Sequence, residues 1–211
     1  MTCGGTGGHI NPAIAVANRI KMISPGAEIA FVGTEKGMES SLVPKAGYPI
    51  RFVKVRGFKR KLTLANIDAA IKAVTSVVAA KRIIRDFQPD VVIGTGGYVS
   101  WPTVKAAAKL GVPTLIQEQN AFPGVTQRML AKYADKICVS FEESRKFFDA
   151  SVQDKILLTG NPVSASGITR AQAREKLGLE PGALYVVSSG GSLGAEKVNG
   201  DVFGVIGSDT G

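Results

Sequence analysis

Short apolar runs alternate along the chain with longer stretches in which apolar residues recur at helical spacing. The apolar runs lie at residues 29–33, 50–55, 91–94, 114–117, 136–140 and 156–159, and we expect each of them to form a strand. Several of these runs are apolar throughout, which is typical of parallel strands that helices cover on both faces. The pattern therefore predicts an α/β fold built on a parallel sheet.

Helices are predicted between these strands, at residues 11–22, 64–87, 101–110, 126–133 and 142–148. Pro12 would occupy the second position of the first helix, where its missing N–H is harmless. Gly111 follows the third helix and is a typical stop residue. Strands and helices thus alternate over the first 160 residues.

Turn-forming residues at 159–164 (Thr-Gly-Asn-Pro-Val-Ser) interrupt this alternation. A helix at 169–177 and a strand at 184–188 follow, as in the first unit of a second domain, and the residues that remain are too few for a core. We therefore expect an N-terminal domain over residues 1–160, and a linker with the incomplete start of a C-terminal domain over residues 161–211. Only Met1, Thr2 and Cys3 precede the first glycine-rich turn, so its strand is very short or begins upstream.

Three glycine-rich turns stand between a predicted strand and a predicted helix, at residues 4–8, 94–97 and 189–195. Such turns lie at one edge of a parallel sheet, and the N–H groups of the helix that follows favour an anion. The first two turns could face one ligand and the third could face it across a cleft, which suits a diphosphate-bearing substrate. The spacing of the first turn is neither G-x-G-x-x-G nor a Walker A motif. A tight turn without a ligand is the alternative.

Two sets of polar residues beside these turns are candidates for chemistry. His9, the single histidine, adjoins the first turn, where its imidazole could act as a general base. A helix-capping or packing role is the alternative for His9. Gln117, Glu118, Gln119 and Asn120 end a strand, where they fit recognition of sugar hydroxyls or acid–base work, and an ordinary polar loop is the alternative.

The net charge of +9 is concentrated in the first 90 residues, which hold 14 Lys and Arg against six Asp and Glu. Residues 51–61 carry six basic side chains and no acid, and a partly apolar helix with further basic residues follows. This combination favours contact with an anionic membrane surface, while a solvated face or nucleic acid are alternatives. No RNA-reading motif is present, and no apolar run approaches the ~20 residues that span a bilayer.

Cys3 and Cys138 provide neither a disulfide framework nor, with one histidine, a structural zinc site. A reducing compartment fits this cysteine content.

Five motifs, GGTGGHINPA, GTGGYVSWP, QEQNAFPG, TGNPV and GGSLGA, occur in this order within residues 2–199. Together they resemble the MurG family of glycosyltransferase family 28, peripheral membrane enzymes that convert lipid I to lipid II in bacterial peptidoglycan synthesis. The segments GTEKGMESSLVPKAGYPI and VRGFKRKL are similar to the same family. The resemblance implies a GT-B fold, with a Rossmann-like parallel-sheet N-terminal domain and the truncated start of a second Rossmann-like domain.

The resemblance also implies an inverting transfer of N-acetylglucosamine from UDP-N-acetylglucosamine to the 4-hydroxyl of MurNAc in undecaprenyl-diphosphoryl-MurNAc-pentapeptide, which is lipid I. It implies no cofactor and no metal ligand, and a peripheral position on the cytoplasmic face of the bacterial cell membrane. Cell-wall synthesis and division proteins are further expected partners, and nucleic acid is not expected as one.

Several residues match family positions that bind the donor. The resemblance places Thr6, Gly7 and Gly8 in contact with the donor, and Asn120 on the side of its sugar. Ser192, in the third glycine-rich turn, would meet the nucleotide diphosphate.

Other residues match positions at the acceptor. His9 corresponds to the candidate base or acceptor-site residue of the family, and Glu118 is the other candidate for the base. Gly96, Gly97 and Tyr98 belong to the turn that would hold the diphosphate of the acceptor.

Two departures qualify the resemblance. Ser164 stands where many family members carry arginine after Asn-Pro-Val, so a cationic donor contact is absent or comes from elsewhere. Most of the positions that read the uracil and the donor sugar lie beyond this chain, so we expect it to bind donor weakly and to turn over little by itself. A non-catalytic GT-B half that binds a membrane or a partner is the alternative function, and an RNA-binding domain is supported by charge alone.

Overall fold

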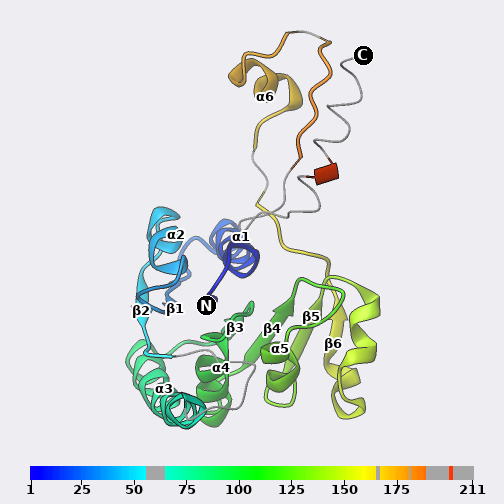
Figure 1. Ribbon diagram of the computed structural model, residues 1–211. Helices are drawn as coiled ribbons and strands as arrows, with labels where there is room; N and C mark the ends of the chain where they lie inside the picture. Colours follow the sequence, from blue (N-terminus) through cyan, green and yellow to red (C-terminus); the bar gives the residue numbers. More distant parts are fainter. Residues whose placement is uncertain (56–64, 165–166, 181, 189–199, 202–211) are drawn as a thin grey trace. The chain divides into compact units, whose positions relative to one another are not determined.

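The computed structural model describes residues 1–55, 65–164, 167–180, 182–188 and 200–201. These residues fall into two compact units, Met1–Ser164 and Ala165–Gly211 (Figure 1). The first unit carries the sheet and the helices around it.

Parallel strands form the sheet of the first unit. They are β1 (Phe31–Gly33), β2 (Ile50–Phe52), β3 (Val92–Gly94), β4 (Thr114–Glu118), β5 (Lys136–Val139) and β6 (Ile156–Leu158), and each lies within one of the predicted apolar runs or extends it by one residue. β1 pairs with β2, and the other strands follow in the order β3-β4-β5-β6. The predicted parallel α/β fold is confirmed.

Thr2 connects the two groups of strands. It forms parallel bridges with Val32 of β1 and with Gly94 of β3. Its N–H donates to the carbonyl of Ile93 at 2.8 Å, and the carbonyl of Met1 accepts from the N–H of Val32 at 2.9 Å. Thr2 therefore occupies the strand position that the sequence predicts before the first glycine-rich turn.

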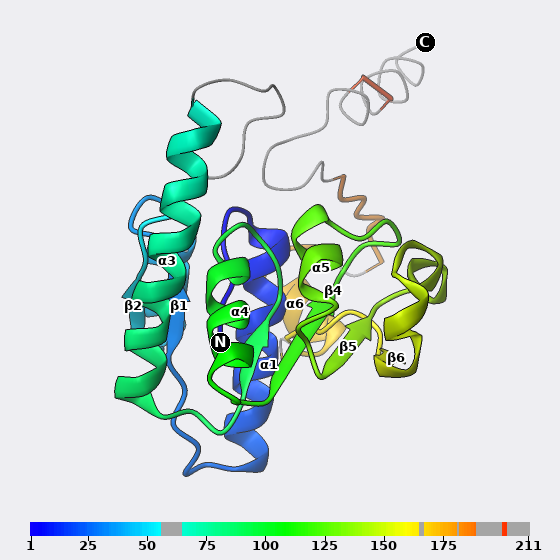
Figure 2. The same ribbon diagram turned by 90° about the horizontal axis from the view of Figure 1, so that it is seen from below.

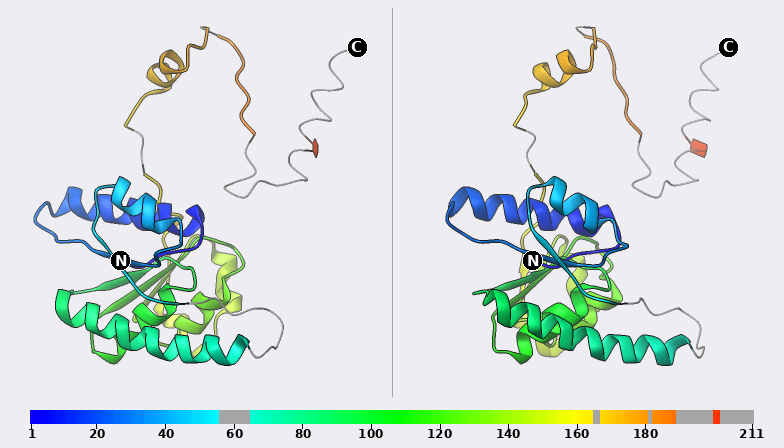
Figure 3. Two further views of the ribbon diagram at one scale, coloured as in Figure 1. Left: turned by 60° about the vertical axis from the view of Figure 1, so that its left-hand side comes forward. Right: turned by 90° about the vertical axis from the view of Figure 1, so that its left-hand side faces the viewer.

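Helices cover the two faces of this sheet (Figures 2 and 3). The α-helices of the first unit are α1 (Gly7–Ile23), α2 (Glu39–Lys45), α3 (Ala65–Phe87), α4 (Ser100–Lys109) and α5 (Val125–Leu130), and two 3₁₀ helices are η1 (Glu142–Phe147) and η2 (Ala150–Lys155). α1 and α2 lie over one face, while α3 and α4 lie over the other (Figure 3). Helices on both faces, with a change of face where the strand order reverses, are typical of a doubly wound sheet.

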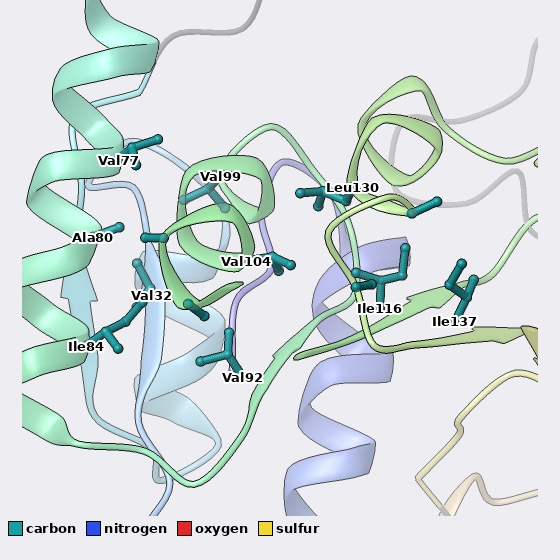
Figure 4. Close-up of a cluster of buried hydrophobic side chains, with 14 of the residues drawn as sticks. Val32, Val77, Ala80, Ile84, Val92, Val99, Val104, Ile116, Leu130 and Ile137 are labelled. Carbon is teal, nitrogen blue, oxygen red and sulfur yellow. The ribbon is translucent and has the colours of Figure 1, made fainter. Parts of the chain in front are cut away.

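The main core lies between the sheet and the helices α3 and α4. Val77, Ala80 and Ile84 of α3 point toward Val32 of β1 and the side chains of α4 (Figure 4). All three residues of β1 and of β3 are buried, whereas the edge strand β2 is largely exposed. Apolar runs without alternation thus mark the strands that are covered on both faces.

Asp135 fixes the amino end of β4. Its carboxylate accepts hydrogen bonds from the N–H of Thr114 at 2.8 Å and from the Thr114 hydroxyl at 2.9 Å. These two bonds lower the pKa of Asp135 below its usual value, because they favour the ionised carboxylate. Asp135 lies at the sheet edge opposite to the glycine-rich turns.

Two helix predictions need correction, and one helix was not predicted. α1 begins at Gly7, four residues earlier than predicted, because the carbonyl of Thr6 accepts from the N–H groups of His9 and Ile10 at 3.1 and 3.2 Å. Pro12 therefore lies inside α1 and not in its first turn. The segment predicted as a helix at 142–148 is the 3₁₀ helix η1, and α2 was not predicted.

The second unit contains α6 (Arg170–Lys176), which the sequence predicts. Thr169 and Gln172 begin it with a capping box, in which each side chain bonds the backbone N–H of the other residue. The predicted strand at 184–188 is wrong: these residues form no strand, and the side chains of Leu184 and Val186 are 91% and 78% exposed. A strand requires a paired neighbour, which the described residues of this unit do not provide.

Candidate active site

Two glycine-rich loops meet at the carboxyl edge of the sheet. Residues 3–8 lead from Thr2 into α1 on one face, and residues 95–99 lead from β3 into α4 on the other. The carbonyl of Thr2 accepts from the N–H of Thr95 at 3.1 Å and from the hydroxyl of Ser100 at 3.2 Å. Thr2 is the point where the strand order reverses, and open α/β sheets bind ligands in the crevice at such a point.

The two loops pack so closely that glycine is required in the second one. Gly97 has a φ of +82°, and a Cβ added there would overlap the carbonyl oxygen of Gly4. Gly96 has a φ of +117°, and a Cβ added there would lie 2.5 Å from Cδ2 of His9. Any larger residue would push the first loop or the imidazole out of place.

Hydrogen bonds around His9 assign its tautomer. Nδ1 of the half-buried His9 lies 3.1 Å from the carbonyl oxygen of Gly4, and 3.5 Å from the Thr6 hydroxyl. A carbonyl oxygen can only accept, so Nδ1 carries the hydrogen and Nε2 of the neutral ring is left as an acceptor. The hydroxyl of Thr95 donates to the backbone carbonyl of His9 at 2.7 Å, which joins the second loop to the first turn of α1. This arrangement suits a general base.

Both helices that begin in these loops present N-termini suited to an anion. Neither α1 nor α4 has an acidic residue in its first turn, and neither has a side-chain cap at Thr6 or Val99. The first N–H groups of an α-helix lack partners within the helix and carry a partial positive charge. Gly7 and Gly8 open α1 without side chains that would keep a phosphate at a distance.

Glu118 organises a third loop at the same edge. Its buried carboxylate accepts from the N–H and the side-chain nitrogen of Asn120, at 2.9 and 2.8 Å, and from the N–H of Gly124 at 2.8 Å. Both carboxylate oxygens are thereby used inside the protein. Asn120 is exposed, and its side-chain nitrogen bonds Glu118, so its side-chain oxygen is the atom that can accept from a ligand.

The loop after β4 is bound to the loop after β3. Nε2 of Gln119 donates to the carbonyl of Thr95 at 2.7 Å, and Gln119 also bonds Gln117. Gln127 of α5 bonds the carbonyl of Gln117 in turn. The polar run that ends β4 is therefore part of the site's framework.

The structure brings most of the predicted site residues to this one edge. Thr6, Gly7, Gly8 and His9 lie in the first loop and the first turn of α1, and Gly96, Gly97 and Tyr98 lie in the second loop; Glu118 and Asn120 follow β4. Ser192 lies outside the described residues, as do Arg56, Lys59, Arg60 and Lys61 of the basic segment.

Sequence reasoning missed Thr34 and Glu39, which lie beneath the first loop. Glu39 is completely buried, and its carboxylate accepts from the N–H of Gly5 at 3.2 Å and from the N–H and hydroxyl of Thr34 at 2.9 and 2.7 Å. The hydroxyl of Tyr98 lies 3.3 Å from that of Thr34. The clustered glycines 33 and 37 around an acidic residue were the signal that could have marked it.

A hollow of about 530 Å³ lies at the opposite, amino edge of the sheet, where Met1, Ile84 and Val91 are among its lining residues. Ligands of open α/β sheets bind at the carboxyl ends of the strands, so we place the candidate site at the loops described above. No helix among the described residues is both long enough and apolar enough to cross a membrane.

The doubly wound sheet, with two glycine-rich loops where the strand order reverses, has the fold of the N-terminal half of a GT-B glycosyltransferase. Residues 1–139 match the glycosyltransferase family 28 N-terminal domain, and the chain belongs to this family.

Curated relatives within this family share one enzyme name. One relative is a UDP-N-acetylglucosamine–N-acetylmuramyl-(pentapeptide) pyrophosphoryl-undecaprenol N-acetylglucosamine transferase of Acetivibrio thermocellus. The two sequences are 46% identical over 201 residues, and this match covers 94% of the present chain and 54% of the relative. The present chain is 50% identical over 200 residues to the enzyme of the same name from Phocaeicola vulgatus, with 93% and 52% covered. The chain thus spans about half the length of the curated relatives it matches.

Solved structures agree with this assignment. The structure of Acinetobacter baumannii MurG has a TM-score of 0.63 and 33% identity, and the match covers 79% of this chain and 45% of that one. A Staphylococcus aureus MnaA–UDP structure, at 16% identity and a TM-score of 0.56, shares the fold.

Proposed function

We propose that this chain forms the acceptor-side half of an inverting N-acetylglucosaminyltransferase. The whole enzyme would transfer N-acetylglucosamine from UDP-N-acetylglucosamine to the MurNAc 4-hydroxyl of lipid I, the reaction that the names of the relatives indicate. The observation that carries the proposal is the position of His9, with Nε2 available as an acceptor between two glycine-rich loops at the reversal of strand order.

The proposed reaction uses His9 as the general base. Nε2 takes the proton of the acceptor 4-hydroxyl, and the resulting oxygen attacks the anomeric carbon of the donor sugar from the face opposite to UDP. The new glycosidic bond forms as the bond from the anomeric carbon to the diphosphate oxygen breaks. UDP leaves with the electron pair, the proton remains on the imidazolium, and the anomeric configuration is inverted.

The glycine-rich loops would hold a diphosphate. The N-terminus of α1 offers N–H groups at Gly7 and Gly8, and neither α1 nor α4 has an acidic residue in its first turn that would oppose an anion. The division suggested by the family resemblance, with donor at Thr6, Gly7 and Gly8 and acceptor diphosphate at Gly96, Gly97 and Tyr98, stays a prediction.

Glu118 is better suited to positioning than to proton transfer. Both of its oxygens already accept hydrogen bonds from the loop that presents Asn120. We therefore assign the base to His9 and propose that Glu118 orients Asn120 toward a sugar hydroxyl. Ser192 at the nucleotide diphosphate, and the consequence of Ser164 in place of arginine, stay predictions about the completed enzyme.

We also propose peripheral attachment to the cytoplasmic face of the bacterial membrane. The exposed cations Arg51, Lys54 and Arg82, together with Val78 of α3 at 52% exposure, support a basic and partly apolar contact surface. The chain should sediment with vesicles that contain anionic lipid, and the bound fraction should fall as salt is raised. Equal binding to neutral vesicles would contradict this attachment. Contacts with cell-wall synthesis and division proteins stay expectations.

A transfer assay tests the proposed function. The chain is completed with the C-terminal half of the Acetivibrio thermocellus relative and supplied with labelled UDP-N-acetylglucosamine and a lipid I analogue. We expect a β-linked disaccharide product, and we expect little or none from the 211-residue chain alone. A folded, completed chain that forms no product would favour the alternative, a non-catalytic half that binds a membrane or a partner.

A further inference from the structure

Glu39 and His9 bind opposite ends of one peptide group. The peptide that joins Gly4 to Gly5 directs its N–H to Oε2 of Glu39, at 3.2 Å, and its carbonyl oxygen to Nδ1 of His9, at 3.1 Å. A peptide group is planar, so the direction of its N–H determines the direction of its carbonyl. A buried carboxylate at one end also polarises the group and strengthens the hydrogen bond at the other.

Glu39 itself is held rigidly. Oε1 accepts from the N–H and hydroxyl of Thr34, at 2.9 and 2.7 Å, and the residue is completely buried. A Cβ added to Gly4 would lie 2.9 Å from Oε1, and a Cβ added to Gly33 would lie 2.6 Å from Cγ of Glu39. Glycines thus make room for this carboxylate on several sides, which fixes the position from which it reaches Gly5.

The opposite side of the peptide is equally constrained. Gly97 lies against the carbonyl of Gly4 so closely that a Cβ there would overlap it. The 4–5 peptide is therefore enclosed between Glu39, His9 and the second glycine-rich loop, and its N–H faces the carboxylate. If this peptide turned over, its N–H would face Nδ1 of His9, and the imidazole would have to carry its hydrogen on Nε2.

We propose that Glu39 is a positioning residue that acts through the 4–5 peptide group to fix the tautomer and orientation of His9. The significance of this relay for catalysis rests on the proposed function, in which Nε2 of His9 accepts the proton of the acceptor hydroxyl. The relay itself is a property of the chain and can be measured without substrate.

The single histidine makes the test direct. In the chain labelled with ¹⁵N-histidine, nitrogen–proton correlation spectra at a pH where His9 is neutral should show the hydrogen on Nδ1 and an unprotonated Nε2. In Glu39→Gln, the side chain has one oxygen that can accept and one NH₂ group that can only donate. The oxygen should face Thr34, which offers two donors, its N–H and its hydroxyl, whereas Gly5 offers one. The NH₂ group should therefore face the N–H of Gly5, and the spectra should shift to a mixture or to the Nε2–H tautomer.

Asp135→Asn is the matched control. Asp135 holds the N–H and hydroxyl of Thr114 as Glu39 holds those of Thr34, with similar distances, but it lies at the other edge of the sheet. This variant should lose a comparable carboxylate–threonine contact and leave the His9 spectrum unchanged. Thr34→Ala, which keeps the Gly5 contact of Glu39, should also retain the Nδ1–H tautomer.

Three outcomes overturn the relay. They are a wild-type His9 with its hydrogen on Nε2, an unchanged His9 spectrum in folded Glu39→Gln, and an equal change in Asp135→Asn. The wild-type spectrum tests the relay even if Glu39→Gln does not fold, because a hydrogen on Nε2 of His9 would overturn it. The transfer assay is independent of these spectra: a transferase whose His9 ignores Glu39 refutes only the relay, and an intact relay without transfer refutes only the proposed function.

Discussion

His9→Ala is expected to lower kcat of the completed transferase by about 10²- to 10⁴-fold, the usual contribution of a general base. The loss follows from the geometry, because the Gly4 carbonyl occupies Nδ1 of His9 and leaves Nε2 of the imidazole to accept the proton. Initial rates with the lipid I analogue at saturating donor measure the effect. KM should change much less than kcat if the imidazole acts mainly in the transition state.

The control for His9→Ala is a comparison of its unfolding midpoint with that of wild type. His9 is half-buried and its backbone bonds to Thr6 and Thr95 do not need the imidazole, so the unfolding midpoint of His9→Ala should stay close to that of wild type. Unchanged turnover in a folded variant would remove His9 from catalysis, and the base would then have to come from another residue.

Gly97→Ala is expected to have the largest effect on stability, about 2–5 kcal/mol less free energy of unfolding. Its left-handed backbone, with a φ of +82°, costs about 1–2 kcal/mol for a residue with a Cβ. Overlap of that Cβ with the carbonyl of Gly4 adds the cost of overpacking, about 1–3 kcal/mol. Urea unfolding followed by circular dichroism measures the loss.

Gly111→Ala separates the two contributions. Gly111 has a similar φ of +74°, but a Cβ added there would meet nothing within 4 Å. Gly111→Ala should lose only the free energy that the left-handed backbone costs a residue with a Cβ. The difference in free energy of unfolding between the two variants therefore measures the contact between the glycine-rich loops. Equal losses in both variants would show that this contact is not as close as described.

The sequence was sufficient for the sheet, because buried parallel strands such as β1 and β3 are apolar at every position. It was less informative where a tertiary contact outweighs local preference. Gly7 and Gly8 are poor helix formers, yet α1 begins there because the Thr6 carbonyl accepts the first bonds. α2 has only seven residues and contains Pro44, so the sequence shows no helical periodicity that would predict it.

The site was predicted in the same uneven way. The sequence predicts that His9 and the two glycine-rich turns lie at one edge of the sheet, and the structure places them there because the turns that follow parallel strands share an edge. The part played by Glu39 was not predicted, because the glycines at 33 and 37 could mark a buried carboxylate but could not show that it bonds the N–H of Gly5. Glu118 stays one of two predicted candidates for the base, and the hydrogen bonds that occupy its oxygens could not be foreseen, because they depend on how residues 119–124 fold back.

We propose that the glycine-rich loops at the carboxyl edge hold a diphosphate beside His9. Titration of the ¹⁵N-labelled chain with inorganic pyrophosphate, followed through backbone amide shifts, tests it most directly. We expect saturable shifts at Gly5, Gly7, Gly8, Gly96 and Gly97, with little change at Thr114 on the opposite edge. Unmoved loop amides, or shifts confined to the amino edge of the sheet, would contradict it.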